Sequence, residues 1–392
     1  MNKNKFAILA LAVSAFAIGM TEFISVGLLP LIKDAFNVTL PLAGLTVSMY
    51  AIGVTVGAPV LTPLTNKMKR KHLLIGIMLI FIIANALAAF SFSFSMLLAM
   101  RILSALMHGV FMSVATAIAS DLVTPDKRSS AIAMMFTGLT VATITGVPFG
   151  TWIGQQFGWE MSFVAISIIG LLSLIANIIF VPNDLTEYDQ APMSEQLKVF
   201  NNKPLLAVYL ITALGYGGTF VVYTYLTTLL TKSLGYSDHA VVIILILYGV
   251  MVAIGNTLGG KFTNLNPTKA LVWIFLIQAI ILLLVGATVH YHILGLISIL
   301  LMGLFAFMNV PGLQLIVVLF AEKENTSTVN FASSLNIFAF NIGITLGSVI
   351  GGFVLEHFSI ISTPYFGFLM VILASGMMYL LHKKESTALV EC

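Results

Sequence analysis

The chain has few charged residues and almost no cysteine. Only 8% of its 392 residues are charged, whereas about 25% is usual in soluble domains. Its single cysteine, Cys392, is the last residue. A disulfide within one chain is therefore excluded, and so is a zinc site built from thiolates.

Several functional motifs are missing as well. The sequence has no phosphate-binding loop, no zinc-spaced cluster of histidine, glutamate and cysteine, and no appended polar domain. These absences argue against an enzyme and against ATP as the direct energy source. We expect neither a metal nor a bound cofactor.

Hydrophobic residues make up 59% of the chain and gather in long blocks. Blocks of about 18 or more nearly uncharged residues predict transmembrane helices, because a helix satisfies its own backbone polar groups in lipid. The first block is too long for the core of a signal peptide, so we expect it to remain as a helix. The sequence predicts an all-α membrane protein with twelve helices, at residues 6–32, 42–65, 72–90, 95–120, 129–154, 161–181, 204–231, 239–263, 270–289, 293–320, 327–355 and 360–381.

The basic residues are distributed unevenly between the two sides of the predicted membrane. If the amino terminus starts in the cytoplasm, twelve crossings place fifteen of the eighteen lysines and arginines inside. Only Lys33 and Lys232 fall outside, and Arg101 lies within a helix. This bias follows the positive-inside rule and predicts two cytoplasmic termini. The net charge of +3 therefore reflects topology, and we expect no nucleic-acid partner.

The longest polar interruption, residues 182–204, divides the twelve blocks into two sets of six. A shift of 198 residues aligns Tyr50 with Tyr248 and Gly57 with Gly255. Matches at an offset near half the length indicate two six-helix pseudo-repeats. The predicted domains are an N-terminal six-helix bundle at 1–181, a cytoplasmic linker at 182–203 and a C-terminal six-helix bundle at 204–392.

A row of glycines belongs to the same repeat. Spacing of four residues puts such a row on one helix face, where a neighbouring backbone can approach closely, and Pro148 favours a kink there. The row is interpreted either as tight packing alone or as a deformable contact on which the two halves rock. A shift of 197 residues aligns Gly146, Gly150 and Gly154 with Gly343, Gly347 and Gly351.

Three ionisable residues lie deep within the predicted helices: Glu22, Arg101 and His108. Such residues are costly in lipid and usually functional. At about 1.5 Å per residue, Glu22 is roughly 16 Å below Lys33 and His108 roughly 20 Å inside its helix, so both are near the midplane. Arg101 and His108 share one helix face. If that face looks toward the first helix, the three form a column in which Glu22 or His108 carries a proton.

Each of these residues also has a structural interpretation. Arg101 could satisfy backbone carbonyls, and His108 could be a packed polar residue with one hydrogen-bonded nitrogen. A structural role suits Glu22 least, because a buried carboxylate without a partner is unfavourable. Two further acids, Asp121 and Glu356, lie at predicted helix ends.

The second half has other residue types at the matching positions. At the 198-residue shift, Glu22 matches Phe220 and His108 matches Ala306. Tyr209, Tyr216 and Tyr223 recur every seven residues and so form a stripe on one helix face, and Tyr225 follows them. Tyrosines beside a polar cavity can stack on a ligand, although such a stripe also arises from packing alone. We predict proton chemistry in the first half and much of the substrate contact in the second. The predicted substrate-binding residues are Tyr216, Phe220, Tyr223, Asn309, Gln314, Asn336 and Asn341.

Four segments are distinctive: "GMTEFISVGLLPLIKDAFNV", "RILSALMHGVFMSVATAIASDL", "PDKRSSAIAMMFTGLTVATITGVPFGTWIGQQFGW" and "YTYLTTLL". They resemble the twelve-helix drug:proton antiporter family of the major facilitator superfamily, and within it the bacterial sugar-, arabinose- and purine-efflux branch. The resemblance covers nearly the whole chain. It implies the major-facilitator fold and a bacterial inner-membrane exporter that exchanges its substrate for protons by alternating access.

The resemblance also assigns roles to single residues. The family's helix-four arginine corresponds to Arg101. Its helix-five antiporter motif corresponds to Gly146, Pro148, Gly150 and Gly154, although here the proline comes two residues after the glycine and is not adjacent to it.

The loop before the third predicted helix departs from the superfamily pattern. Thr65 and Met68 occupy the places where the superfamily usually carries an aspartate and a glycine. The cytoplasmic basic residues Lys69, Arg70 and Lys71 are present. We therefore do not assign to this chain the acid-based gate contact that the superfamily forms at this loop.

We expect a monomeric secondary transporter that exports drugs, sugars or nucleoside-like compounds and uses the proton gradient. The alternative is a proton-coupled importer or a facilitator of the same fold, because residues do not encode direction. A membrane sensor is a distant alternative. An amphipathic cation would seek Glu22, whereas a sugar or nucleoside would favour the tyrosines and amides.

Overall fold

The computed structural model describes residues 3–65, 68–124, 128–183, 185, 197–263, 266–324 and 328–390. These residues are almost entirely helical and include no strand. Twelve of their helical segments are long and apolar enough to cross a membrane. The predicted all-α membrane architecture is confirmed.

The chain divides into two compact units. Unit 1 comprises Met1–Tyr188 and Asp238–Ile246, and unit 2 comprises Asp189–Ser237 and Leu247–Cys392. Residues 184 and 186–196 of the predicted linker lie outside the described residues, as does Cys392.

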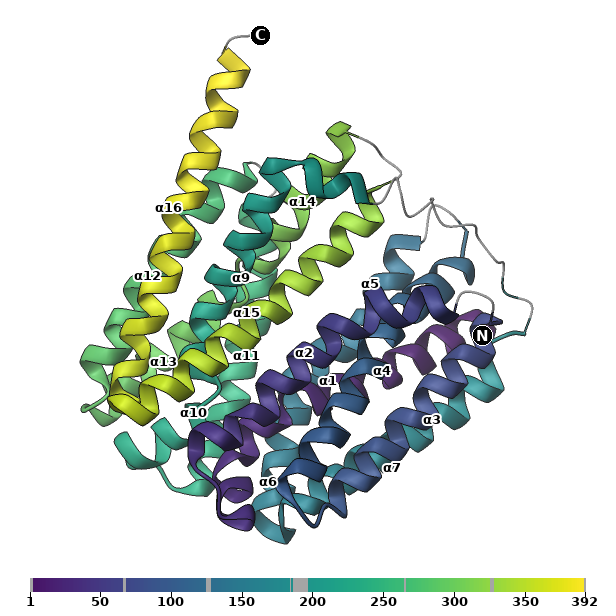
Figure 1. The fold of residues 1–392 in the computed structure, drawn as a ribbon, viewed down its shortest axis with the longest axis horizontal. Helices are drawn as coiled ribbons and strands as arrows, with labels where there is room; N and C mark the ends of the chain where they lie inside the picture. The colour runs from purple at the N-terminus through teal and green to yellow at the C-terminus, as the bar shows by residue number, and fades with distance from the viewer. Residues whose placement is uncertain are drawn as a thin grey trace. The chain divides into compact units, whose positions relative to one another are not determined.

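Unit 1 is built from long helices that lie side by side, coloured purple to blue-green in Figure 1. Helix α1 packs on α5 and α7, while α4 packs on α2 and α3. A side-chain cap starts α4, where Ser93 accepts a hydrogen bond from the backbone N–H of Met96. The helices are α1 (Lys3–Phe36), α2 (Leu40–Thr65), α3 (Arg70–Ala89), α4 (Phe94–Asp121), α5 (Arg128–Val141), α6 (Val147–Phe157) and α7 (Trp159–Phe180).

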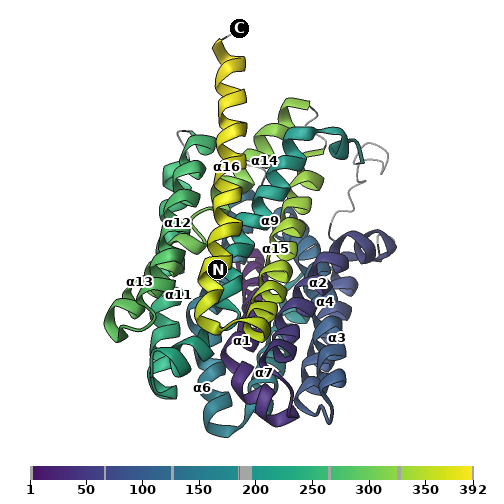
Figure 2. The same ribbon diagram turned by 60° about the vertical axis from the view of Figure 1, so that its left-hand side comes forward.

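Unit 2 has a matching set of helices, coloured teal to yellow in Figures 1 and 2. Helix α9 packs on α15 and α16, and α12 also packs on α16, which extends past the end of α12 in both views. The first residues of α11, Asp238–Ile246, group with unit 1. The helices are α9 (Lys203–Tyr223), α10 (Leu226–Thr228), α11 (Asp238–Thr263), α12 (Pro267–Thr288), α13 (His292–Ala306), α14 (Val310–Glu324), α15 (Val329–His357) and α16 (Thr363–Val390).

Three blocks predicted as continuous helices are interrupted. A π-helical segment, Ala142–Gly146, separates α5 from α6, and Pro148 occupies the first turn of α6. Proline lacks a backbone N–H, so it fits a first turn better than a helix interior. Turns also separate α9 from α10 and α13 from α14, and Pro311 lies just after the second of these.

The repeat offset recurs in the helix contacts of the two units. A Cβ atom on Gly57 would overlap the backbone of Leu106, and one on Gly255 would overlap the backbone of Leu304. Leu106 and Leu304 are themselves 198 residues apart. The same pair of helices therefore crosses at the same glycine in each unit, with no room for a side chain.

The 197-residue offset recurs in the same way. In unit 1, a Cβ atom on Gly154 would overlap the side chain of Leu28 on α1. In unit 2, a Cβ atom on Gly351 would approach the ring of Tyr225, and Leu28 and Tyr225 are also 197 residues apart. The predicted pseudo-repeat is thus present at the level of atomic contacts.

Candidate functional site

Arg101 is buried within unit 1, where it connects α4 to α1 and α2. Its side chain is 1% exposed. Nη1 donates to the Thr21 carbonyl at 2.6 Å, and Nη2 donates to the Glu22 carbonyl at 3.3 Å. Nε and Nη2 both donate to the Thr46 carbonyl, at 3.2 and 3.1 Å. Each helix carbonyl has a second lone pair, so these bonds do not require the helices to unwind.

Tyr50 on α2 connects Arg101 to His108. The Arg101 guanidinium lies over the Tyr50 ring, 4.2 Å from its centroid, which is a cation–π contact. The Tyr50 hydroxyl is 3.3 Å from Nδ1 of His108. Tyr50 and His108 are both buried. Residues two turns apart on α4 therefore contact one tyrosine side chain, Arg101 at the ring face and His108 at the hydroxyl.

Glu22 differs from its neighbours because it is partly exposed. Its backbone carbonyl accepts from Arg101, but among the described residues its carboxylate forms no ion pair. The site therefore combines a buried cation, held by backbone carbonyls, with an acidic residue that is less completely buried. The structure brings together all three residues predicted for proton coupling.

A further polar contact supports α4 beside Arg101. The amide of Asn85 on α3 donates to the hydroxyl of Ser104 at 3.1 Å and to the carbonyl of Phe81 at 2.9 Å. Asn85 and Ser104 are both buried. A satisfied polar pair between helices fixes their register, so α3 holds α4 at the level of Arg101.

The predicted aromatic residues of unit 2 form one continuous cluster on α9. Tyr216 contacts Phe220 with ring centroids 5.0 Å apart, and Phe220 contacts Tyr223 at 5.4 Å. Tyr223 stacks on Tyr248 of α11 at 5.2 Å with the planes 16° apart. All four rings are buried. Phe340 on α15 also packs edge-on against Tyr216, at 4.9 Å.

Asn309 lies in the turn between α13 and α14 and belongs to a buried amide network. Its amide donates to Oε1 of Gln278 on α12 at 3.0 Å. Gln278 in turn donates to the Gly215 carbonyl at 3.1 Å and to the Thr219 hydroxyl at 2.7 Å. Oδ1 of Asn309 has no hydrogen-bond partner among the described residues. The network joins the helix break to α9 and α12.

Asn336 and Gln314 form a second amide network. Asn336 donates to Oε1 of Gln314 at 2.9 Å and accepts from the Thr212 hydroxyl at 2.8 Å. Asn341 is separate and donates to the Ile337 carbonyl of its own helix. The structure therefore distributes the four predicted amides among two networks and one isolated position.

The glycines of the predicted antiporter motif, Gly146, Gly150 and Gly154, lie at the end of the π-helical segment and in α6, and they face α1 within unit 1. Cβ atoms on Gly146 and Gly150 would meet side chains of Met20 and Ile24. The contacts of this row are therefore close packing between two helices of one unit. The π-helical segment directly before Pro148 adds an irregular turn to this packed stretch, as often occurs at functional positions.

The basic residues before the third span have different contacts. Arg70 forms an ion pair with Asp121 at the end of α4, and Lys71 donates to the Ile178 carbonyl on α7 at 2.9 Å. Lys69 is exposed and precedes α3. Arg70 and Asp121 thus fasten the ends of α3 and α4 within unit 1.

Sequence reasoning did not identify Tyr50, Tyr248 or Gln278 as members of the site. The two tyrosines were visible only as matching positions of the repeat. Gln278 is the single glutamine of a strongly apolar span, and a polar residue in such a span usually signals an interhelical bond. Attention to that signal would have identified it.

Comparison with known proteins gives consistent matches. A sequence model described as the Major Facilitator Superfamily matches residues 11–334. The MFS-type transporter YtbD of Bacillus subtilis (strain 168) is 54% identical over 388 residues, which is 98% of each chain. The inner membrane transport protein YdhP of Escherichia coli (strain K12) is 36% identical over 354 residues, which is 90% of each chain.

A solved structure matches the fold over nearly the full length. It is a bacterial homologue of the human lysosomal transporter Spinster, in an inward-facing and unoccupied conformation. The TM-score is 0.79, with 14% sequence identity, and the match covers 98% of both chains. At this identity the likeness concerns the fold alone.

Proposed function

Because the chain belongs to the Major Facilitator Superfamily, we propose that this multi-pass membrane transporter exports small organic molecules in exchange for protons by alternating access. The observation that carries the proposal is the cluster of Glu22, Arg101 and His108 within the membrane-spanning part of unit 1. Ionisable groups at this depth are rare, and proton relays are among their main uses.

The cluster has the parts that a proton-coupled step needs. Arg101 is held by carbonyls of α1 and α2, so its charge stays at a fixed position. Glu22 is less completely buried than Arg101 and His108, and in this proposal its carboxyl group is the one that takes up and releases the proton. Protonation of Glu22 removes a negative charge beside a fixed positive one. The electrostatic balance of α1 and α4 therefore depends on whether a proton is bound.

His108 is the second candidate carrier. It is 4% exposed, and its described polar contact is the Tyr50 hydroxyl. A proton that reached His108 would change the hydrogen bond to Tyr50 and, through it, the ring beneath Arg101. We propose Glu22 before His108 as the proton carrier, because Glu22 is the less buried residue of the two.

Substrate contact is proposed for unit 2. Its aromatic cluster and its two amide networks supply flat apolar faces and paired donors and acceptors, which suit a drug, a sugar or a nucleoside-like compound. Tyr209 and Tyr225 are less suited, because their hydroxyls donate to the Ala332 and Ser348 carbonyls of α15.

We further propose a location in the bacterial cytoplasmic membrane with both termini in the cytoplasm. The bias of basic residues supports this orientation. The name of the Escherichia coli relative YdhP includes "inner membrane". The proposed working form is a monomer.

The proposal is tested by transport into proteoliposomes under an imposed pH gradient. The probes are ethidium, arabinose and inosine, one for each substrate class. Exchange of substrate for protons predicts that a probe moves against the direction of proton flow. Movement together with protons would indicate an importer, and movement that ignores the gradient would reject coupling.

The variant Glu22→Gln keeps the shape of the side chain and removes its titration. It should lose the response to the gradient. Glu356→Gln is the matched control, because Glu356 lies exposed near the end of α15. Unchanged coupling in Glu22→Gln would reject Glu22 as the carrier and leave His108.

A further inference from the structure

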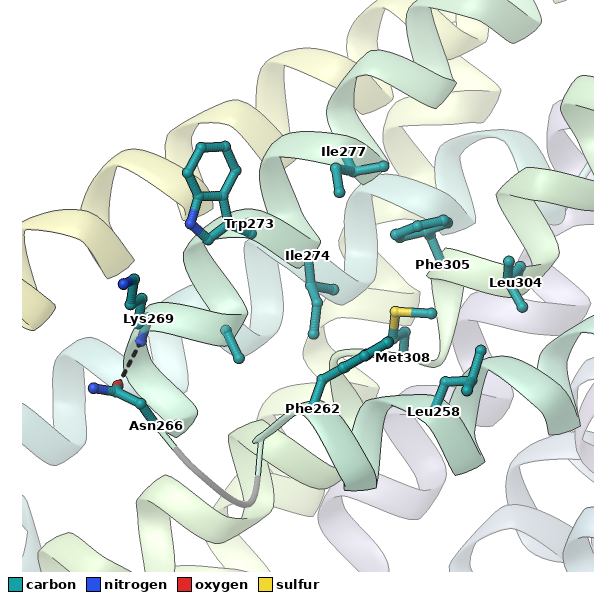
Figure 3. Close-up of a pocket in the computed structure, with 11 residues that line it drawn as sticks. Leu258, Phe262, Asn266, Lys269, Trp273, Ile274, Ile277, Leu304, Phe305 and Met308 are labelled. Atoms are coloured by element: carbon teal, nitrogen blue, oxygen red, sulfur yellow. Dashed lines mark hydrogen bonds between the residues drawn. The ribbon is translucent and has the colours of Figure 1, made fainter.

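An elongated groove of about 470 Å³ opens on the surface of unit 2, between α11, α12 and the α13–α14 segment. Figure 3 shows Lys269 and Asn266 at one end of the groove and Leu304 and Phe305 at the other. Helix α12 packs on both α13 and α14. The residues that line the groove include none of the polar cluster of unit 1.

The lining of the groove is apolar except at the Lys269 end. Of its eleven residues, Lys269 alone is charged. The Lys269 side chain is exposed and has no acidic partner among the described residues. Its backbone N–H donates to Oδ1 of Asn266 at 3.0 Å, the bond drawn in Figure 3. The ammonium group is therefore available to a ligand while the helix start is already capped.

The groove lies on helices that are long and apolar enough to span a membrane, so we expect lipid to contact it. Phe262 and Trp273 are each 57% exposed on its walls. Tryptophan is enriched where a membrane meets water, and Lys269 lies one helical turn before Trp273. In the proposed orientation this end of α12 faces the cytoplasm, and basic pockets between helices on that side bind anionic headgroups.

Unit 1 does not repeat this arrangement. The position that matches Lys269 is Lys71, whose ammonium donates to the Ile178 carbonyl at 2.9 Å. The position that matches Trp273 is Ile75. At matching positions of the repeat, the lysine of unit 1 donates a hydrogen bond to a backbone carbonyl. The lysine of unit 2 has no acidic partner among the described residues and lies one turn from a tryptophan.

We propose that the groove is a binding site for an anionic phospholipid, with the phosphate at Lys269 and an acyl chain along the apolar walls toward Leu304 and Phe305. The charge of Lys269 favours an anionic headgroup over a zwitterionic one. The apolar walls of the groove favour a lipid whose acyl chain lies in the groove over lipid that only surrounds the protein. The site is independent of the proposed proton coupling.

Tryptophan fluorescence tests this site directly, because Trp273 is one of only three tryptophans. The protein is placed in phosphatidylcholine vesicles that contain a fixed fraction of either dibrominated phosphatidylglycerol or dibrominated phosphatidylcholine. Subtraction of the Trp273→Phe signal isolates the quenching of Trp273. We expect the brominated phosphatidylglycerol to quench Trp273 more strongly at the same mole fraction.

Lys269→Ala should reduce this preference about fivefold, as expected for one basic residue near a membrane surface. Lys269→Arg should restore it. Lys203→Ala is the matched control, because Lys203 is an exposed lysine of unit 2 outside the groove, and the preference should persist. Equal quenching by both lipids, no quenching by either, or an unchanged preference in Lys269→Ala would overturn the proposal.

Discussion

Arg101 can act as a structural residue that satisfies backbone carbonyls, or as a fixed charge that influences Glu22. Its contacts show the structural role directly. Its donors reach carbonyls on α1 and α2, so it satisfies the structural interpretation of a buried arginine. The same bonds fix a positive charge beside Glu22. A residue that fastens three helices and sets the local field can transmit the charge state of Glu22 to the packing of α4.

The two repeat-related tyrosines give a matched test at this scale. Tyr50→Phe removes the hydroxyl that contacts Nδ1 of His108 and should lower the unfolding free energy by about 1 kcal/mol. Tyr248→Phe should be neutral or stabilising, because the buried Tyr248 hydroxyl has no hydrogen-bond partner among the described residues. Thermal unfolding of the purified proteins in detergent measures both effects.

The ring of each tyrosine remains in both variants, so the cation–π contact to Arg101 and the stack on Tyr223 are kept. Equal losses in Tyr50→Phe and Tyr248→Phe would mean that the contact with His108 contributes nothing.

Helix crossings are the feature by which the two units most resemble each other. Gly57 and Gly255 allow the same helix pair to meet at backbone distance in each unit. A helical glycine costs about 1 kcal/mol relative to alanine. Its presence at both crossings is therefore explained by the space it leaves.

Substitution at one of these crossings should be destabilising despite the better helix propensity of alanine. Gly255→Ala places a methyl group on the Leu304 carbonyl and should lower stability by about 1–3 kcal/mol. Gly376→Ala on α16 is the control, because a Cβ atom there meets nothing within 4 Å, and it should stabilise by about 0.5–1 kcal/mol. Thermal unfolding in detergent is again the measurement, and a stabilised Gly255→Ala would contradict the close crossing.

The helices were predictable from sequence, but of their interruptions only the one beside Pro148 was indicated, as a kink. Long apolar blocks fix the twelve spans, because lipid demands helices of that length. The break beside Asn309 is accompanied by a polar contact with a neighbouring helix. The partner is Gln278, 31 residues away, and a local pattern does not contain such a contact.

The site was predictable in its charged part and only partly in its polar part. Glu22, Arg101 and His108 stand out because ionisable residues are rare in lipid, and the structure brings them together. Tyr50 stands between Arg101 and His108, but an aromatic residue in an apolar block carries no such signal. The hydrogen-bond partner of each predicted amide depends on how helices distant in sequence pack against each other.

At the scale of the whole molecule, unit 1 holds the ionisable residues and unit 2 holds the aromatic cluster. We predict that Phe220→Ala, which opens that cluster, changes the relative transport of ethidium, arabinose and inosine more than it changes the dependence on pH. Transport rates for the three probes across a series of pH values measure both. A shifted pH dependence with unchanged probe preference would contradict the division of roles.

The central claim is that Glu22 couples substrate movement to proton movement. The most direct measurement follows protons in substrate-free proteoliposomes with an internal pH dye after addition of a transported probe. We predict that the wild-type protein moves protons opposite to the probe, and that Glu22→Gln moves none while it still exchanges labelled for unlabelled probe. Proton movement of wild-type size in Glu22→Gln, with Glu356→Gln as the control, would contradict the claim.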